Sequence, residues 1–391
     1  MKGIKKHTHK ERAQVLMSLV PLIKQKFGKN LMAIATRGSF ARKTDQPYSD
    51  LELFVFLKEM PRGQKKLPYA KMRKICDGLL VELIWIIKEV YIREVKEVSS
   101  AWFGSGADIL MPVYNKTFAD KLNQYKIVDL KKKCLDQAVL LWPSLLSTST
   151  ALINIVGKKE QDRIALAIQR MFDNVLNFLS FINQQPFTTY SQKIKEAKKF
   201  KIKPKSFLKL TKIIVEGEFK NYDEIKKCVT EILKELKCFL KQNGYELIEN
   251  SSIKRYKSDS FGMENRNKRY EQVVLVWDKV QESTAKVLNA AETKNREGMV
   301  MVIGDMFFQY LKVLSCLNAK TLRFSQIIKD AKKLKYKPVG FLQLIRIIEK
   351  SEYKKLPEIK KIVTGIFSEL ENKIEKLDYK LYQDNFDLNK I

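Results

Sequence analysis

Histidine is almost missing from this chain, and its scarcity limits the chemistry that the protein can perform. The two histidines, His7 and His9, both lie in a basic stretch at the N-terminus, where we expect a tail. A serine or cysteine nucleophile needs a base, most often histidine, and catalytic zinc is commonly held by histidine. We therefore expect any catalysis to depend on carboxylates, lysine or a hard metal ion.

Cysteine is scarce and irregularly placed. The five cysteines are an odd number, are widely spaced and form no C-x-x-C pair: Cys76, Cys134, Cys228, Cys238 and Cys316. Such a set predicts neither a disulfide framework nor a structural zinc site. It indicates a reducing compartment, so we expect a cytoplasmic protein.

Long hydrophobic runs are also missing. The best run, from Leu79 to Ile87, is short and carries Glu82. The apolar stretch from Val15 to Ile23 is interrupted by Pro21 and followed by lysines, which indicates an amphipathic helix rather than a signal peptide. We expect no membrane-spanning segment.

Positive charge, in contrast, is abundant. The 391 residues include 74 Lys and Arg against 44 Asp and Glu, a net charge of +30, and 45% of them are hydrophobic, which is enough for a core. The length predicts two or three domains at roughly 100 to 200 residues each. The charge predicts an anionic partner, such as nucleotide phosphates, nucleic acid or an acidic surface.

The chain divides into a part with strand signals and a part without them. Helical spacing from Glu11 to Phe27 ends at Gly28, and apolar runs then predict strands at 31–36, 51–57, 79–86 and 109–114. Beyond about residue 131 only long helical patterns remain. The sequence therefore predicts a small sheet domain followed by helices.

The helical part contains an internal repeat. The stretch SQKIKEAKKFKIKPKSFLKLTKII from Ser191 returns as SQIIKDAKKLKYKPVGFLQLIRII from Ser325, an offset of 134, and upstream pairs such as Trp142 and Trp277 match at an offset of 135. One insertion or deletion thus separates two copies of a helical domain. We predict a sheet domain over 1–127, the first copy over 128–248, a polar linker over 249–269 and the second copy over 270–391.

The strongest chemical motif is RGSFARKTDQPYSDLELFVF, residues 37–56. A Gly38-Ser39 turn after a strand places backbone N–H groups and a hydroxyl where phosphate oxygens bind. Ten residues later, Asp50 and Glu52 begin the next strand and point to the same side. Two such carboxylates suit Mg²⁺, which prefers oxygen ligands and keeps positions open for a triphosphate. Glu82 lies inside an apolar run, where completing a metal site would offset its burial.

The spacing Gly38-Ser39, ten residues, Asp50-x-Glu52 resembles the signature of the polymerase-β-like nucleotidyltransferase superfamily. The fuller string GSFARKTDQPYSDLE is similar to the kanamycin (aminoglycoside) nucleotidyltransferase family, and the likeness extends more loosely to VEL around Glu82 and to a helical C-terminal domain. The resemblance implies an α+β fold: an N-terminal polymerase-β-like nucleotidyltransferase domain, followed here by two tandem-duplicated all-α helical bundles.

The resemblance also implies an activity. A nucleoside monophosphate would move from Mg²⁺-bound NTP, with ATP expected, to a hydroxyl, and pyrophosphate would be released. By position, Asp50 and Glu52 would bind metal, Glu82 would assist the metal or the acceptor, and Gly38, Ser39 and Arg42 would hold the nucleotide.

In that family a helix of the C-terminal domain supplies Glu-x-x-x-Lys across a dimer interface. The second copy has this pair as Glu282 and Lys286, whereas the first copy has Ser147 and Ala151 at the same places. Residues four apart share one helical face, so Glu282 could act as a base while Lys286 binds phosphate. We hypothesise that the second copy replaces a partner subunit, which makes one chain a monomer that acts as a pseudo-dimer. The alternative is an ordinary surface pair on a packing module.

Three functions remain open from the sequence. One is an enzyme that nucleotidylates a small molecule such as an aminoglycoside and confers antibiotic resistance; the charge of +30 counts against a polycationic acceptor, unless acids such as Glu82, Glu89, Glu94 and Glu97 form a negative pocket. Another is a nucleotidyltransferase acting on RNA, such as a tRNA-modifying toxin. The last is a non-catalytic nucleotide- or nucleic-acid-binding protein. The lysine-rich stretches 193–212 and 329–337 are interpreted as solvated helix faces rather than nucleic-acid tracks.

Overall fold

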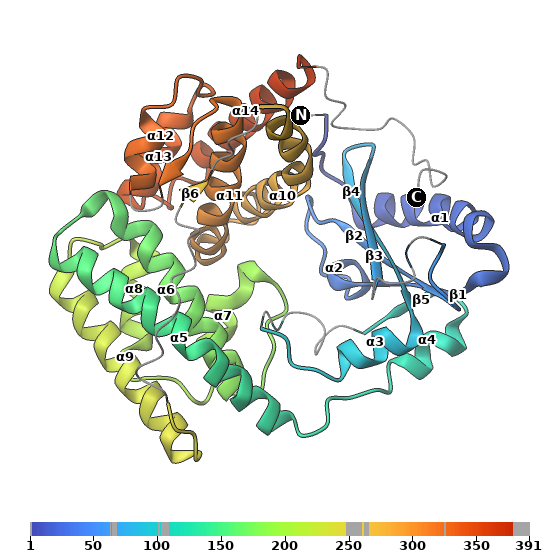
Figure 1. Cartoon of the computed structure of the whole chain (residues 1–391), viewed down its shortest axis with the longest axis horizontal. Helices are drawn as coiled ribbons and strands as arrows, with labels where there is room; N and C mark the ends of the chain where they lie inside the picture. Colours follow the sequence, from blue (N-terminus) through green and yellow to red (C-terminus); the bar gives the residue numbers. More distant parts are fainter. Residues whose placement is uncertain are drawn as a thin grey trace.

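A five-stranded sheet with flanking helices is followed by two groups of helices. The computed structural model describes residues 2–62, 64, 69–100, 102, 109–247, 260–261, 266–323 and 326–377. Figure 1 shows the sheet domain in blue and cyan beside the two helical groups, one green to yellow and the other gold to red. The predicted order, a sheet domain followed by duplicated helical domains, is confirmed.

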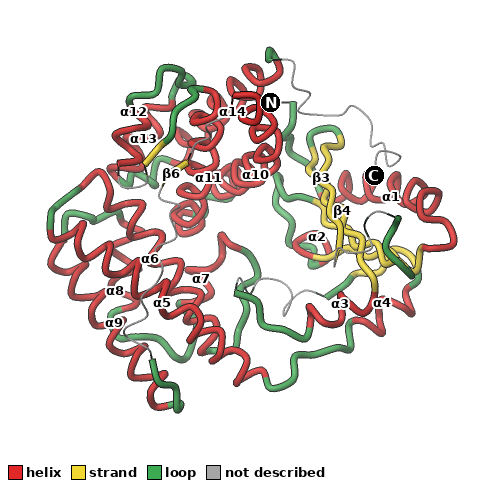
Figure 2. The backbone as a smooth tube through the Cα atoms, viewed as in Figure 1, coloured by secondary structure: helices red, strands yellow, loops and turns green. Residues whose placement is uncertain are grey.

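The sheet is mixed, with the strand order β3-β4-β2-β1-β5. Strands β2 and β4 are parallel and the other neighbours are antiparallel; the strands are yellow in Figure 2. The elements of this domain are α1 (His9–Phe27), η1 (Gly28–Asn30), β1 (Leu31–Arg37), α2 (Gly38–Ala41), β2 (Leu51–Leu57), β3 (Tyr69–Cys76), β4 (Leu79–Ile87), α3 (Lys88–Val95), β5 (Met111–Tyr114) and α4 (Lys116–Leu122).

The strand β3 was not predicted. Its sequence, YAKMRKIC, carries three basic residues that break the apolar pattern. Because β3 is the edge strand and pairs only with β4, it needs no continuous apolar run, and charged residues are typical of such edges. The other four strands lie where the sequence predicts them, within two residues at either end.

Helices cover both faces of the sheet. Leu51, Leu53 and Val55 of β2 share a core with α1, while Phe54 and Phe56 share a second core with α3 and α4. This division follows from the alternation of side chains along a strand. Glu52 precedes Phe54 and Phe56 on the α3 and α4 side, so it emerges at the end of that apolar face.

The helical domains repeat each other helix by helix. The first copy consists of α5 (Leu130–Gly157), α6 (Gln161–Ile182), η2 (Tyr190–Gln192), α7 (Lys193–Ala197), α8 (Phe207–Glu216) and α9 (Tyr222–Gln242). The second consists of α10 (Arg266–Glu292), α11 (Arg296–Leu317), β7 (Leu322–Arg323), α12 (Ile327–Lys332), α13 (Phe341–Lys350) and α14 (Leu356–Glu375). Helices α6 and α11 begin 135 residues apart, and α8 and α13 begin 134 apart, as the sequence repeat predicts.

The predicted linker over 249–269 contains regular structure. Strand β6 (Ser260–Phe261) pairs with β7, and α10 begins at Arg266. The expectation that strands end before residue 131 is therefore wrong for this short pair. The rest of the predicted linker lies outside the described residues.

The two copies pack against each other through α6 and α11. The Gln169 Nε2 donates to the Val300 carbonyl at 2.5 Å. Arg296 forms a bidentate pair with Glu216, with distances of 3.1 and 3.0 Å. Bidentate pairs restrict orientation, so this contact fixes one copy relative to the other.

Two helices, α5 and α11, are long and apolar enough to cross a membrane by length and composition. Both pack into the helical bundle, α5 against α6 and α9, and α11 against α10. Core helices of globular proteins have the same composition, so this is weak evidence for a membrane span.

Candidate active site

The turn between β1 and α2 is built around a glycine that no other residue can replace without displacement. Gly38 has a φ of 74°, and a Cβ added to it would lie 2.3 Å from the Glu52 Oε2. The left-handed backbone and this contact both require glycine. The close approach brings the Glu52 carboxylate against the Gly38-Ser39 turn.

Three carboxylates gather at one end of the sheet. Asp50 directly precedes β2, and Glu52 of β2 stands opposite Glu82 of β4 in the parallel register. Removal from water raises the pKa of Asp50 to about 7, and the negative charges of Glu52, Glu282 and Glu82 add to this effect. A raised carboxyl pKa means that the ionised form is costly here, and a cation between the carboxylates would relieve that cost.

Protein cations already stand beside two of these acids. Lys71 of β3 forms an ion pair with Glu82, which is almost fully buried, and the Arg37 Nε lies 3.9 Å from the Glu52 Oε2. Within the described residues no group of three His, Cys, Asp or Glu side chains is arranged to hold a metal ion. Mg²⁺ commonly binds through one or two carboxylates plus substrate phosphates, so Asp50 and Glu52 fit it as a donor pair.

The second helical copy presents its Glu–Lys pair to the same place. Glu282 and Lys286 of α10 line a cavity of about 520 Å³ that is also lined by Ser39, Arg42 and Asp50. The Lys286 Nζ lies 2.6 Å from the Glu282 Oε1. Desolvation in the cavity lowers the pKa of Lys286, but Glu282, Asp305 and Asp50 outweigh it and raise that pKa overall. The structure thus brings residues more than 200 positions apart into one cavity of one chain.

Gly38, Glu52 and Glu82 are not among the described residues on the cavity wall. Glu52 lies against the Gly38 turn, and Glu82 stands beside Glu52 in the sheet. The predicted site residues are therefore neighbours, but only some of them line the cavity.

The N-terminal segment, expected to be a tail, ties the sheet domain to the second copy. The backbone N–H groups of Lys2 and Gly3 each donate to the Glu371 carboxylate at 2.9 Å, and the Lys6 Nζ lies 2.6 Å from the Glu292 Oε1. Nearer the cavity, the Tyr48 N–H donates to the Asn289 Oδ1 at 2.8 Å. These contacts hold α10 against the loop that leads to Asp50.

The first copy also lines the cavity, which sequence reasoning missed. Its contribution is the segment from Thr188 to Lys199, with the wall residues Thr188, Thr189, Ser191, Gln192, Lys195, Glu196 and Lys199. The Arg42 Nη2 approaches the Thr188 carbonyl at 3.5 Å. The only sequence signal was the lysine-rich stretch, which was interpreted as a solvated face.

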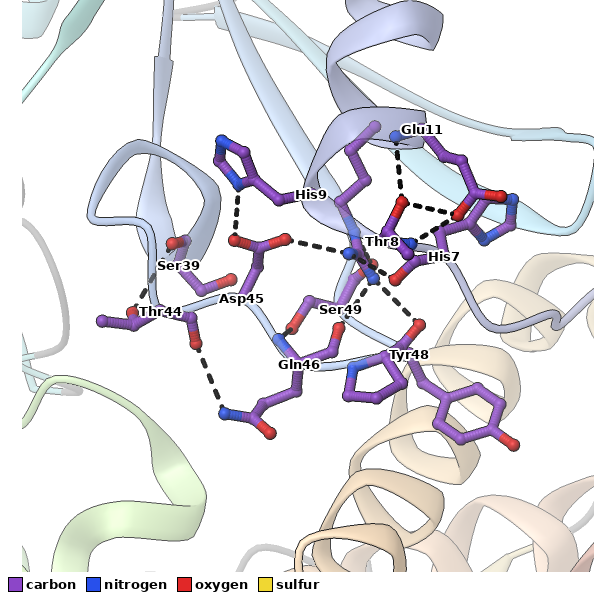
Figure 3. A network of polar contacts seen from close by, with 12 residues as sticks. His7, Thr8, His9, Glu11, Ser39, Thr44, Asp45, Gln46, Tyr48 and Ser49 are labelled. Carbon is purple, nitrogen blue, oxygen red and sulfur yellow. Dashed lines mark hydrogen bonds and ion pairs between the residues drawn. The ribbon is translucent and has the colours of Figure 1, made fainter.

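A second missed residue is Arg12 of α1, which organises the loop before Asp50; its partners His7, Asp45, Gln46 and Ser49 are labelled in Figure 3. Its guanidinium is fully buried and lies 2.9 Å from the Asp45 Oδ2. It also donates at 2.7 to 3.0 Å to the carbonyls of His7, Gln46, Pro47 and Ser49. A buried charge is tolerated only when its donors are satisfied, and here one arginine fixes both the N-terminal segment and the loop.

The N-terminal histidines belong to the same network. His9 is the first residue of α1; its Nδ1 lies 2.8 Å from the Asp45 Oδ1 and its ring stacks on Phe40 at 4.4 Å. The helix begins with a capping box in which the Thr8 side chain accepts from the Glu11 N–H. The predicted tail is therefore wrong for this segment, because long-range contacts order it.

The acids suggested as a negative pocket do not form one with the cavity. Glu89, Glu94 and Glu97 are absent from its described lining, and Glu97 pairs with Lys133 at 2.8 Å. Although these three glutamates belong to the sheet-domain part of the sequence, they do not line the described wall of the cavity.

The fold is an N-terminal domain with a small mixed sheet followed by two helical bundles, as predicted. Residues 145–246 match the family described as "KNTase C-terminal domain", which confirms the predicted likeness to the kanamycin nucleotidyltransferase family. The match falls on the first copy, the one without the Glu–Lys pair.

Among solved structures, the chain is similar to a nucleotidyltransferase-like protein from Exiguobacterium sibiricum 255-15. The two share 11% identity with a TM-score of 0.32, over 60% of this chain and 76% of that one. No curated protein matches the chain.

Proposed function

We propose that the protein is an Mg²⁺-dependent nucleotidyltransferase that transfers a nucleoside monophosphate from an NTP, with ATP expected, to a hydroxyl group of a small molecule. The observation that supports this most is the shared cavity. It joins Ser39, Arg42 and Asp50 of the sheet domain to Glu282 and Lys286 of the second copy.

The reaction assigns each group a role. The acceptor oxygen forms a bond to the α-phosphorus, the bond from that phosphorus to the bridging oxygen breaks, and pyrophosphate leaves. Glu282 takes the proton of the acceptor hydroxyl as general base, and Lys286 beside it offsets charge on the phosphates. Ser39 and Arg42 orient the nucleotide.

Asp50 and Glu52 would hold Mg²⁺, which neutralises phosphate charge and orients the triphosphate when bound. The raised pKa of Asp50 supports this role, because a carboxylate crowded by other carboxylates is poised for a cation. Glu82, although paired with Lys71, supports the same cluster from the neighbouring strand.

The acceptor is a hydroxyl compound with little positive charge. The resemblance implies an aminoglycoside and hence antibiotic resistance. However, the cavity wall carries the cations Arg42, Lys195, Lys199 and Lys286 against the acids Asp50, Glu196 and Glu282. Together with the net charge of +30, this balance favours a neutral or anionic acceptor over a polycation.

We also propose that the chain acts as a monomer in the cytoplasm, with the second copy in the place of a partner subunit. Sedimentation analysis would then show a 45.7 kDa species that retains activity on dilution. An activity that falls as a dimer dissociates would contradict the pseudo-dimer.

The test of function is incubation with each labelled NTP and Mg²⁺, with aminoglycosides, lincosamides and total tRNA offered as acceptors. We expect labelled small-molecule product and pyrophosphate, and neither with Asp50→Asn. Label in tRNA instead would favour the RNA-directed enzyme. NTP binding without any product or pyrophosphate would favour the non-catalytic protein.

A further inference from the structure

Two lysines of the first copy lie on the cavity wall without a function in the scheme above. Lys195 of α7 and Lys199, which follows that helix, are exposed residues that line the same cavity as Asp50. Both belong to the segment of the first copy that lines this cavity. Two ammonium groups on one wall of a cavity create a local positive potential.

The charges of these lysines are not used by the fold. Among the described residues, no acid forms a salt bridge with Lys195 or Lys199. Their neighbours differ: Lys198 pairs with Glu297, and the fully buried Lys193 lies 2.6 Å from the Asp173 Oδ1. The segment therefore directs some lysines into structural pairs and leaves these two for the cavity.

The acids of the cavity wall are engaged elsewhere. Glu282 pairs with Lys286. Glu196 accepts the Thr188 N–H at 3.0 Å and also the Thr188 hydroxyl. Among the described residues, neither of these acids nor Asp50, the third acid of the wall, forms a salt bridge with Lys195 or Lys199, so an anionic ligand would be their first ion-pair partner.

The lysine segment is adjacent to the phosphate-binding side of the site. The Arg42 Nη2 meets the Thr188 carbonyl, and the charge of Glu196 acts on the Arg42 guanidinium. Arg42 belongs to the turn that begins at Gly38 and Ser39. The segment that carries the lysines thus lies beside the Gly-Ser turn, to which the proposed function assigns the phosphates of the NTP.

The position of the segment is fixed. The Lys193 Nζ is also 2.8 Å from the Asn177 Oδ1 on α6, and the Asn295 Nδ2 at the start of α11 donates to the Ser191 carbonyl at 3.3 Å. Both copies therefore hold the segment, and a preformed cation pair spends less of its binding energy on ordering.

We propose that Lys195 and Lys199 form a subsite for the terminal phosphates of the NTP. The two lysines then hold the pyrophosphate as it leaves. The inference rests on the proposed function and deepens it, since it gives the first copy a role: the first copy holds the leaving group, and the second supplies the base. A phosphate group on the acceptor could bind the same two lysines. The test below therefore distinguishes phosphate of the NTP from phosphate of the acceptor.

The repeat provides a matched control. Lys329 and Lys333 stand 134 residues after Lys195 and Lys199, are likewise exposed, and are absent from the described lining of the cavity. The double variants Lys195→Ala/Lys199→Ala and Lys329→Ala/Lys333→Ala each remove two charges. They therefore change the long-range field of the protein by the same amount and differ only in location.

The measurement is calorimetric binding of ATP, inorganic pyrophosphate and AMP to the full chain with Mg²⁺. We expect Lys195→Ala/Lys199→Ala to weaken ATP and pyrophosphate binding by about 10- to 100-fold and to leave AMP within about twofold. The variant Lys329→Ala/Lys333→Ala should bind all three like the parent. Thermal unfolding of both variants confirms that each is folded.

Three results would overturn the assignment. One is an unchanged affinity of Lys195→Ala/Lys199→Ala for ATP and pyrophosphate. If the KM of an acceptor rises in that variant, the two lysines bind a phosphate group of the acceptor instead. Another is an equal loss in both double variants, which reduces the effect to net charge. The third is an equal loss for AMP. Lysine-dependent binding of ATP in a protein that transfers nothing would support the subsite while contradicting the proposed function.

Discussion

The two helical copies share their cores and differ on the face that meets the sheet domain. Phe172 and Phe207 stack in the first copy with ring centroids 5.8 Å apart, and their counterparts Phe307 and Phe341 stack at 5.9 Å. On the surface, by contrast, the Glu282–Lys286 pair of the second copy has no equivalent in the first.

This difference follows from position in the chain. Of the two corresponding helices, α10 lines the cavity of Asp50 and α5 does not among the described residues, so the glutamate and lysine of α10 reach the carboxylate cluster. The corresponding face of α5 does not line that cavity. Packing demands the same residues in both cores, whereas the surface residues depend on what each copy meets.

The largest expected effect tests the base. Glu282→Gln removes the proton acceptor and should lower the rate of pyrophosphate release by about 10² to 10⁴-fold. The matched change at the same repeat position, Ser147→Gln, should leave the rate unchanged. Equal rates for the two variants would contradict the asymmetry between the copies.

A transplant sharpens this result. Ser147→Glu with Ala151→Lys, placed in the Glu282→Gln background, restores the pair in the first copy only. We expect no recovery of pyrophosphate release, because α5 faces no sheet-domain carboxylates in the cavity. Recovery would mean that the first copy can also reach Asp50.

Equivalent substitutions in the cores of the two helical copies should destabilise the protein by similar amounts. Trp142→Ala and Trp277→Ala each remove a buried ring and should each lower the free energy of unfolding by about 3 to 5 kcal/mol. The midpoint of urea unfolding measures both. A much smaller loss for one tryptophan would show that the two cores are not equivalent.

For the sheet domain, the test is how the free energy of unfolding changes with pH, because Asp50 is the group whose pKa is raised. The pKa of Asp50 is raised to about 7, so in the folded state the group binds a proton that the unfolded chain has released. Stability without metal should therefore fall as the pH rises from about 4 to 7. Asp50→Asn should remove part of this fall and stabilise the metal-free protein by about 1 to 4 kcal/mol at pH 8, while transfer is lost.

Thermal unfolding at several pH values, with and without Mg²⁺, measures the Asp50 effect. Mg²⁺ should raise the unfolding temperature of the parent more than that of Asp50→Asn. A variant less stable than the parent at pH 8 would show that the Asp50 carboxylate is stabilised rather than strained.

The smallest expected effect concerns the contact between α10 and the loop. Asn289→Ala removes the acceptor of the Tyr48 N–H and should cost about 1 kcal/mol and raise the KM for the NTP. Asn154 stands at the same place in the first copy and is exposed. Asn154→Ala should therefore change neither quantity, and a matching loss would show that the asparagine acts only within its helix.

Local pattern was sufficient for much of this architecture. Nearly continuous apolar runs predicted β1, β2 and β4, because a strand between two covered faces needs apolar residues along its whole length. The Gly38-Ser39 turn and Asp50-x-Glu52 were readable because their geometry is set within about fifteen residues. The repeat was readable because identical cores require similar residues at similar spacing.

Features that depend on distant partners were not readable. Arg12 resembles any polar residue on an amphipathic helix, and only the fold shows that it satisfies four carbonyls and Asp45. The N-terminal segment was taken for a tail because its partners, Glu371 and Glu292, lie at the other end of the chain. Lys195 and Lys199 carry no local signal that distinguishes them from solvated lysines.

The sequence by itself limited the chemistry we expect: with two N-terminal histidines and no C-x-x-C pair, any catalysis was expected to depend on carboxylates, lysine or a hard metal ion. It also determined that one helical copy carries Glu282 and Lys286 and the other does not. Only the tertiary structure decided that this pair lines the cavity of Asp50, and that lysines of the first copy line the same cavity. Charge interactions between groups depend on distance in space, and helix packing sets that distance for residues hundreds of positions apart.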